Sequence, residues 1–281
     1  MKKEFRILIP TDFSAASRAG MRFAVQWARQ QKSRLIFAHV LDVIKFAEWS
    51  DSKYAGYTAA QRKLTARRLR SAVGDVMRHR TIGRSGYDAK LVEGAGVNHV
   101  LADLTRDKDI DLICMGTNGA GSLQNVSGTR TKKLIFGSAV PVVAVPAGYR
   151  SKPIKNILYA TDLVDFSGEL AEVLDLTRPL GAKITVIHFA SVGEVQLDHS
   201  LISQVWKKQY GCPIELIYGN MDPTLTLADN LQLAVNRLKP SLLAMFTDRQ
   251  RTWFQRLLYP SHSGRMSSLS KVPLLVMAKR K

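Results

Sequence analysis

The sequence contains few cysteines and no long apolar run. Its two cysteines, Cys114 and Cys212, lie far apart in the chain, which excludes a disulfide framework and a cysteine-rich zinc site. No run of about 18 apolar residues occurs, which excludes a membrane-spanning helix. The first residues, Met1 to Arg6, lead into a strand-like segment without an apolar signal core. We therefore expect a cytoplasmic protein that does not associate with membranes.

The sequence also lacks the motifs of common hydrolases. It has no Gly-x4-Gly-Lys-Ser/Thr P-loop and no Gly-x-Ser-x-Gly nucleophile elbow. Two histidines, His39 and His188, end predicted strands and are expected to be structural. The other four, which lack an acid or cysteine at metal-ligand spacing, are His79, His99, His199 and His262. We predict no catalytic residue, no metal site and at most very slow hydrolysis of a bound nucleotide.

Acidic residues are much less common than basic residues in this sequence. The 281 residues include 41 Lys+Arg against 23 Asp+Glu, a net charge of +18, and 46% of them are hydrophobic, which is ample for a buried core. Most of the excess lies in residues 1–150, which carry +13, whereas residues 151–281 carry +5. Five cations crowd nine acid-free residues, and they are Arg62, Lys63, Arg67, Arg68 and Arg70.

This basic cluster has two interpretations. Leu64 and Leu69 interrupt it, which favours a surface helix whose apolar residues face a sheet and whose cations are solvated. The alternative is a surface that binds nucleic acid, because clustered cations attract phosphates in a salt-sensitive way. The solvated helix is the preferred interpretation.

The chain contains two copies of one pattern. Ile7 to Ser14 recurs as Ile157 to Val164, at an offset of 150 residues. Three further segments recur in the same order: Arg34 to His39 as Lys183 to His188, Asp111 to Thr117 as Ser241 to Thr247, and Val140 to Val145 as Val272 to Met277. The later offsets are 130 and 132 residues, so the second copy is shorter.

Each copy alternates short β-branched runs with segments of helical spacing. This alternation predicts right-handed βαβ crossovers and a doubly wound parallel sheet. Ser14 is expected to cap the first helix, and Val97 to Leu104 are expected to lie on another. We predict an α/β protein of two tandem flavodoxin-like or Rossmann-like domains, residues 1–148 and 153–281, joined by a linker at Ala147 to Lys155.

The first copy carries a candidate anion site at the carboxyl ends of its strands, where open parallel sheets bind ligands. Glycines after the fourth strand let the backbone approach a phosphate, and Asp12 can accept a hydrogen bond from a ribose hydroxyl or an adenine amine. The candidate residues are Pro10, Thr11, Asp12, Val40, Met115, Gly116, Gly119, Gly128 and Thr129. Each signal also has a plainer interpretation, because spaced glycines form tight turns and aspartates cap helix starts.

Taken together, these segments resemble the universal stress protein family in its tandem form. The resemblance spans nearly the whole chain and is carried by Ile7 to Ser14, Ala38 to Val40, Asp111 to Thr117, the glycine loop and Val140 to Pro146. It implies a five-stranded domain of the adenine nucleotide alpha hydrolase-like type, which binds ATP or AMP, with Mg²⁺ as an accompanying ion. It also implies a bacterial-type stress-response protein that acts as a nucleotide-dependent switch or sensor.

The resemblance assigns roles to single residues. Asp12 would hold the ribose or the adenine, and the Val40 backbone would read the adenine edge. The phosphates would be cradled by Gly116, Gly119, Gly128 and Thr129.

The first copy departs from the family pattern Gly-x2-Gly-x9-Gly-Ser/Thr at one point. The spacer after Gly119 has eight residues instead of nine, and Arg130 follows Thr129. The loop could absorb this shortening, or the shortening could displace the phosphate-facing amides. Arg130 and Lys132 could add contacts to phosphate.

The second copy is predicted to be degenerate. It keeps Asp162 and His188, but Phe246 replaces the first glycine and bulky aromatics follow in residues 253–264. We expect this copy to serve packing or partner recognition. Single-domain members of the family pair through their last strands, which implies an intramolecular pseudo-dimer of the two copies and makes a homodimer of two chains plausible.

Overall fold

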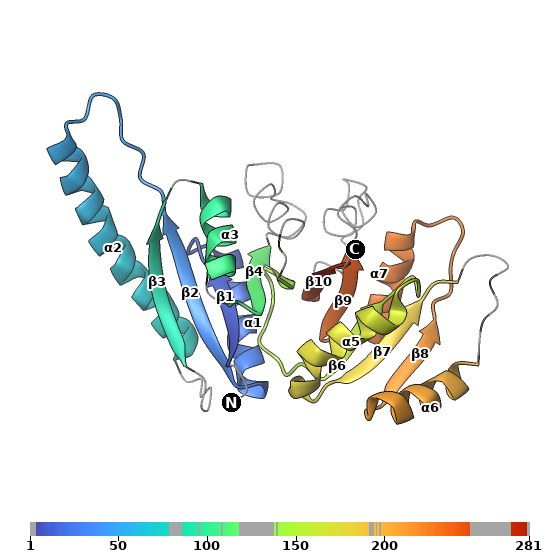
Figure 1. Cartoon of the computed structure of the whole chain (residues 1–281). Helices are drawn as coiled ribbons and strands as arrows, with labels where there is room; N and C mark the ends of the chain where they lie inside the picture. Colours follow the sequence, from blue (N-terminus) through green and yellow to red (C-terminus); the bar gives the residue numbers. More distant parts are fainter. Residues whose placement is uncertain are drawn as a thin grey trace.

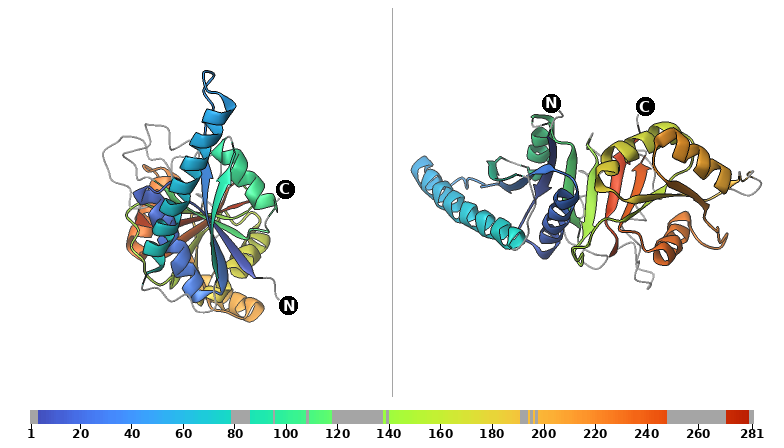
Figure 2. Two further views of the ribbon diagram at one scale, coloured as in Figure 1. Left: turned by 90° about the vertical axis from the view of Figure 1, so that its left-hand side faces the viewer. Right: turned by 90° about the horizontal axis from the view of Figure 1, so that it is seen from below.

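The computed structural model describes residues 4–78, 86–94, 96–107, 109–117, 138, 140–190, 194, 196, 198–247 and 271–279. Within these ranges, ten strands form one sheet in the order β3-β2-β1-β4-β5-β10-β9-β6-β7-β8, with helices on both faces (Figure 1, Figure 2). Neighbouring strands are parallel, except that β5 and β10 pair antiparallel at the centre. The predicted α/β fold with doubly wound parallel sheets is confirmed.

The two halves of the sheet repeat one strand order outward from the central pair. The elements of the first half are β1 (Phe5–Pro10), α1 (Ala15–Gln30), β2 (Ser33–Leu41), α2 (Asp51–Met77), β3 (Tyr87–Glu93), α3 (Val97–Asp107), β4 (Leu112–Thr117) and β5 (Val142–Pro146). Those of the second half are β6 (Asn156–Ala160), α5 (Phe166–Thr177), the 3-10 helix η1 (Arg178–Leu180), β7 (Lys183–His188), α6 (His199–Tyr210), β8 (Ile214–Tyr218), α7 (Leu227–Leu238), β9 (Leu242–Thr247) and β10 (Leu274–Ala278).

The inner strands of the sheet are largely buried on both faces, as their apolar runs predict, whereas no residue of the edge strand β3 is buried. In β1, Ile7, Leu8 and Ile9 are all fully buried. Because successive side chains of a strand point to opposite faces, Ile7 and Ile9 join a core with α1, α2 and α5, whereas Leu8 joins a second core with α3 and α7. The helices therefore form a layer on each side of the sheet.

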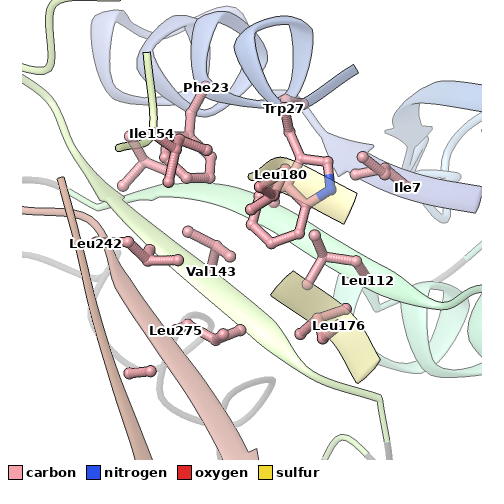
Figure 3. Packing of buried hydrophobic residues seen from close by; sticks show 14 of the residues in the cluster. Ile7, Phe23, Trp27, Leu112, Val143, Ile154, Leu176, Leu180, Leu242 and Leu275 are labelled. Carbon is pink, nitrogen blue, oxygen red and sulfur yellow. The ribbon is translucent and has the colours of Figure 1, made fainter. Parts of the chain in front are cut away.

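The halves are joined by packing as well as by strand pairing. Val143 of β5 lies opposite Leu275 of β10, and both are fully buried (Figure 3). The predicted linker is also fixed: the Gln30 amide group of α1 donates to the carbonyl oxygens of Ile154 and Leu180 at 2.9 Å, and its oxygen accepts from the Ile154 amide at 2.8 Å. Ile154 itself is buried, so the connection is anchored to the core at this residue.

Helix α2 is 27 residues long and only its second part packs on the sheet. No residue from 51 to 64 is buried, and burial begins at Thr65. Leu69 is buried as predicted, but Leu64 is 61% exposed, so the expectation that it faces the sheet was wrong. Residues 42–64 form an arm that projects beyond the ends of β2 and β3 (Figure 1).

Aromatic side chains hold the arm together. The Trp49 ring lies edge-on to Phe46 and Tyr57, with centroid distances of 5.1 and 5.0 Å. The Tyr54 hydroxyl donates to the Val43 carbonyl oxygen at 3.1 Å, which ties the loop to the helix. Among the helices of the described ranges, α2 included, none has an apolar stretch long enough to cross a bilayer.

Candidate functional site

The end of β1 and the loop that follows it carry three of the predicted site residues. Pro10 ends β1 opposite Ala38 of β2. The Thr11 amide donates to the Ala38 carbonyl oxygen at 2.9 Å, and the buried Thr11 hydroxyl oxygen accepts from the Phe13 amide at 3.2 Å. Because these bonds fix the loop on both sides of Asp12, they hold that residue at the carboxyl edge of the sheet.

Asp12 is exposed and presents a charged acceptor at this edge. Its carboxylate accepts from the Ser14 amide at 3.0 Å, while the helix cap itself is Ser14, as predicted, which accepts from the Ser17 amide at 3.1 Å. Partial desolvation of the carboxylate favours its neutral form, but the hydrogen bonds from Ser14 outweigh this and lower the pKa of Asp12. Within the described residues Asp12 has no cationic partner.

Phe13 has a strained backbone that the sequence did not reveal. Its φ of 67° lies in the left-handed region, which is uncommon for a bulky residue. Its ring stacks on His39 with a centroid distance of 4.4 Å, and the Arg68 guanidinium lies 4.5 Å from the ring centroid. His39 Nδ1 is 2.7 Å from the Thr11 carbonyl oxygen, so His39 supports the loop, in agreement with its predicted structural role.

Arg68 is the neighbour of the site that sequence reasoning missed. It belongs to the basic cluster of α2, whose members are alike in sequence. Periodicity alone could not tell which of them would face the loop, because that depends on the angle at which α2 crosses the sheet. Its contact with Phe13 links the loop to α2.

The backbone amide and carbonyl groups of Val40 point to the side of β2 on which β1 lies, beyond the residue where β1 ends. The pairing of β1 with β2 ends at Pro10 opposite Ala38, whose carbonyl oxygen then accepts from Thr11. Alternate residues of a strand direct their amide and carbonyl groups to the same side, so Val40 directs both toward β1, beyond the last pair. The Val40 side chain packs on the opposite side from Phe13, against the core under α3.

Met115 and Gly116 lie near the end of β4, beside β1. Met115 is buried in the core. A Cβ atom at Gly116 would lie 1.8 Å from the Ala16 carbonyl oxygen, and one at Gly20 would lie 2.8 Å from the Gly116 amide nitrogen. The two glycines therefore let the first turns of α1 pack directly on β4.

The strand order reverses between β1 and β4, so Asp12, Val40 and Gly116 share the edge where open parallel sheets bind ligands. The remaining predicted site residues, Gly119, Gly128 and Thr129, lie outside the described residues, as do Arg130 and Lys132.

The second half repeats the geometry of the loop. The Thr161 amide donates to the Ile187 carbonyl oxygen at 3.1 Å, and the Thr161 hydroxyl oxygen accepts from the Leu163 amide at 3.0 Å. Leu163 has a φ of 62°, and His188 Nδ1 is 3.0 Å from the Thr161 carbonyl oxygen. Asp162 accepts from the Val164 amide, as Asp12 does from Ser14.

In contrast to Asp12, Asp162 is neutralised. Lys279 Nζ lies 3.0 Å from Asp162 Oδ2 and 3.1 Å from Glu169 Oε1, and the Tyr159 hydroxyl donates to the buried Glu169. Desolvation favours neutral Lys279, but its bonds to the two carboxylates outweigh this and raise its pKa above the usual 10.5. Burial, and then the bond to Glu169, raises the pKa of Tyr159. The ammonium group of Lys279 thus lies at this edge of the sheet and supplies a cation from the chain itself.

Two positions account for this difference between the halves. The Lys279 amide donates to the Thr247 carbonyl oxygen, as the Ala147 amide does to Thr117, so Ala147 is the equivalent of Lys279. Glu169 lies in the first turn of α5, whereas the first turn of α1 has no acidic residue.

Phe246 is the counterpart of Gly116. It is buried, with its ring 6.1 Å from that of Tyr159, which in turn stacks on Phe166 at 6.3 Å. Aromatic rings therefore fill the space that the backbone of α1 occupies in the first half. The aromatic residues 253–264 lie outside the described residues.

Three histidines of the described residues lie within ion-pair distance of an acid, and one of them, His199, is only loosely paired, with its Nδ1 3.8 Å from Asp198. His99 Nδ1 lies 3.0 Å from Asp103 of the same helix, so the statement that His99 has no acid at ligand spacing was wrong. His188 Nε2 lies 2.8 Å from Glu194. No group of three such residues that could hold a metal ion occurs in the described part of the chain.

Comparison with known proteins agrees with the fold. The family model described as the universal stress protein family matches residues 5–146. A universal stress protein from Archaeoglobus fulgidus DSM 4304 superposes with a TM-score of 0.68 at 13% identity, covering 98% of this chain and 96% of that one. A putative universal stress protein from Pseudomonas aeruginosa UCBPP-PA14 gives a TM-score of 0.52 at 13% identity, with 97% and 92% covered. A search of curated proteins by sequence gave no match.

Proposed function

The chain belongs to the universal stress protein family, and we propose that its first half binds an adenine nucleotide, ATP or AMP, at the carboxyl edge of β1, β2 and β4. The observation that carries this proposal is the contrast between Asp12, which has no cationic partner within the described residues, and Asp162, which Lys279 neutralises. A charged acceptor held on a fixed loop suits a ribose hydroxyl or an adenine amine.

The described residues fit the base and ribose of such a ligand. Asp12 would accept from the ribose or the adenine amine, and the Val40 amide and carbonyl would pair with the adenine edge. Pro10 and Thr11 position this loop, and Met115 with Gly116 would form the floor of the site near β4. The phosphates would extend toward Gly119, Gly128 and Thr129. Mg²⁺ that accompanies the nucleotide would be held mainly by phosphate oxygens and water.

The nucleotide would act as a signal in the cytoplasm, with no hydrolysis or very slow hydrolysis. Occupancy would favour one arrangement of the Asp12 loop, and the contact of Phe13 with Arg68 would pass that preference to α2. The predicted domains, residues 1–148 and 153–281, would form a pseudo-dimer through β5 and β10, in which the second domain serves packing or partner recognition.

Calorimetry with ATP and AMP tests the proposal on the wild type and on two matched variants. Asp12→Ala should weaken binding at least about tenfold, about 1.4 kcal/mol, because the ligand loses a charged hydrogen-bond acceptor. Asp162→Ala removes the repeat-equivalent carboxylate and should leave the affinity unchanged. Absence of binding to the wild type at millimolar ligand would refute the proposal, and an equal loss in both variants would refute the assignment to the first half.

A further inference from the structure

The outward face of α2 carries a row of three cations. Lys63, Arg67 and Arg70 stand at positions i, i+4 and i+7, so they share one side of the helix. All three are exposed, and the buried Leu69 lies on a different side of the helix. These three residues form the basic stripe.

The charge of the basic stripe is not compensated. Of the other two cations in the cluster, Arg62 is paired with Glu93 and Arg68 lies over the Phe13 ring. Lys63, Arg67 and Arg70 make no ion pair within the described residues, and α2 has no acidic residue between Asp51 and Asp75. Solvated cations at such a spacing form a local positive field that attracts polyanions.

Exposed aromatic rings lie on the arm, on the N-terminal side of the basic stripe. Phe46 is 55% exposed and Tyr57 is 45% exposed, although both pack edge-on against Trp49. Tyr57 precedes Lys63 by six residues, which places it about 9 Å away along the helix axis and about a third of a turn around it. Partly exposed rings beside cations are the combination that single-stranded nucleic acids use, with phosphates on the cations and bases stacked on the rings.

We propose that the basic stripe and the exposed rings of the arm bind single-stranded nucleic acid. Lys63 to Arg70 spans about 10 Å along the helix, so the three cations can contact phosphates of one strand. The net charge of +18 complements a polyanion and opposes pairing with a second copy of the same arm. A duplex keeps its bases stacked inside, so it would use the cations but not the rings.

Fluorescence anisotropy with a labelled oligouridine, about 20 nucleotides long and without added nucleotide, tests the proposal. The test variant carries Lys63→Gln, Arg67→Gln and Arg70→Gln, which retain high helix propensity. The matched control carries Lys155→Gln, Lys207→Gln and Lys208→Gln, which remove three exposed cations from the second half. Circular dichroism establishes that each variant keeps its helix content.

Three counterion-releasing contacts should weaken wild-type binding about 20-fold between about 50 and 200 mM salt. The stripe variant should bind more weakly at 50 mM, and its salt slope should fall by about 2, while the control should stay near the wild type. A Tyr57→Ala variant should weaken binding to the oligouridine and not to a duplex of equal length.

Three results would overturn the proposal. The first is absence of wild-type binding at about 50 mM salt, and the second is an equal loss in the stripe variant and the control. The third is a stripe-dependent binding to anionic phospholipid vesicles without binding to the oligouridine, which would assign the surface to a membrane. None of these outcomes depends on whether Asp12 binds a nucleotide.

Discussion

The two halves of the sheet have the same loop after their first strands but different surroundings for its aspartate. Thr11 and Thr161 make equivalent hydrogen bonds, and Phe13 and Leu163 have the same left-handed backbone. Asp12 is exposed, however, whereas Lys279 bridges Asp162 and Glu169. The strained loop therefore belongs to the fold, whereas a few side chains around it decide whether the charge of its aspartate is neutralised within the chain.

The glycine of β4 illustrates the same lesson. Gly116 is a candidate for phosphate contact by its place in the sequence, but in the structure it makes room for α1. In the second half Phe246 fills the corresponding space with a ring. A glycine near a site can thus be required by packing, independently of any ligand.

Of the substitutions that test the comparison between the halves, Gly116→Ala should have the largest effect on stability. Its Cβ would lie 1.8 Å from a backbone oxygen that cannot move without shifting α1, so we expect a loss of about 3 kcal/mol of unfolding free energy. Urea denaturation followed by circular dichroism measures the loss. Gly74→Ala, at a helical position with open space around it, should instead stabilise by about 0.5–1 kcal/mol. Equal effects at the two positions would contradict the packing role of Gly116.

Lys279→Ala gives the second half the residue found at the equivalent position of the first. It leaves the buried Glu169 without its cation and should cost about 2 kcal/mol, whereas Lys155→Ala, at an exposed position, should be nearly neutral. The folded-state pKa of Lys279 is raised, so its contribution is complete at neutral pH and is lost as pH rises above 10.5 through the folded value. Urea denaturation across pH should show that the difference in unfolding free energy between the wild type and Lys279→Ala becomes smaller above pH 10.5. If this difference becomes smaller between pH 6 and 9 instead, the titration of Lys279 is not its cause.

Ala147→Lys makes the reverse exchange and should have the smallest effect. A lysine here would pair with Asp12 and compete with the proposed nucleotide, so calorimetry should show an affinity about tenfold lower, about 1.4 kcal/mol. Ala147→Met adds similar length without charge and should bind as the wild type does. If both substitutions weaken binding equally, the effect is steric. The idea that a lysine charge at this position competes with the nucleotide for the aspartate is then wrong.

Much of the fold follows from local patterns. Short apolar runs predict strands such as β1, and Ser14 predicts the start of α1, because burial on two faces and helix capping are set by nearby residues. The offset of 150 residues between the copies identifies Thr161 and Asp162 as the equivalents of Thr11 and Asp12 from the sequence alone.

The arm of α2 shows where such patterns fail. Leu64 and Leu69 are equally apolar, yet only Leu69 is buried, because five residues place the two about 140° apart around the helix and both cannot face the sheet. An apolar residue of a helix is covered only if its spacing puts it on the side that packs.

The sequence by itself determined the repeat, the α/β class and the position of Asp12 at a strand end, because these depend on spacing along the chain. Only the tertiary structure decided the environment of that aspartate. Lys279 and Asp162 are 117 residues apart, and Arg68 and Phe13 belong to separate elements. Which charge lies beside which loop is set by how strands and helices pack, and no local pattern records that geometry.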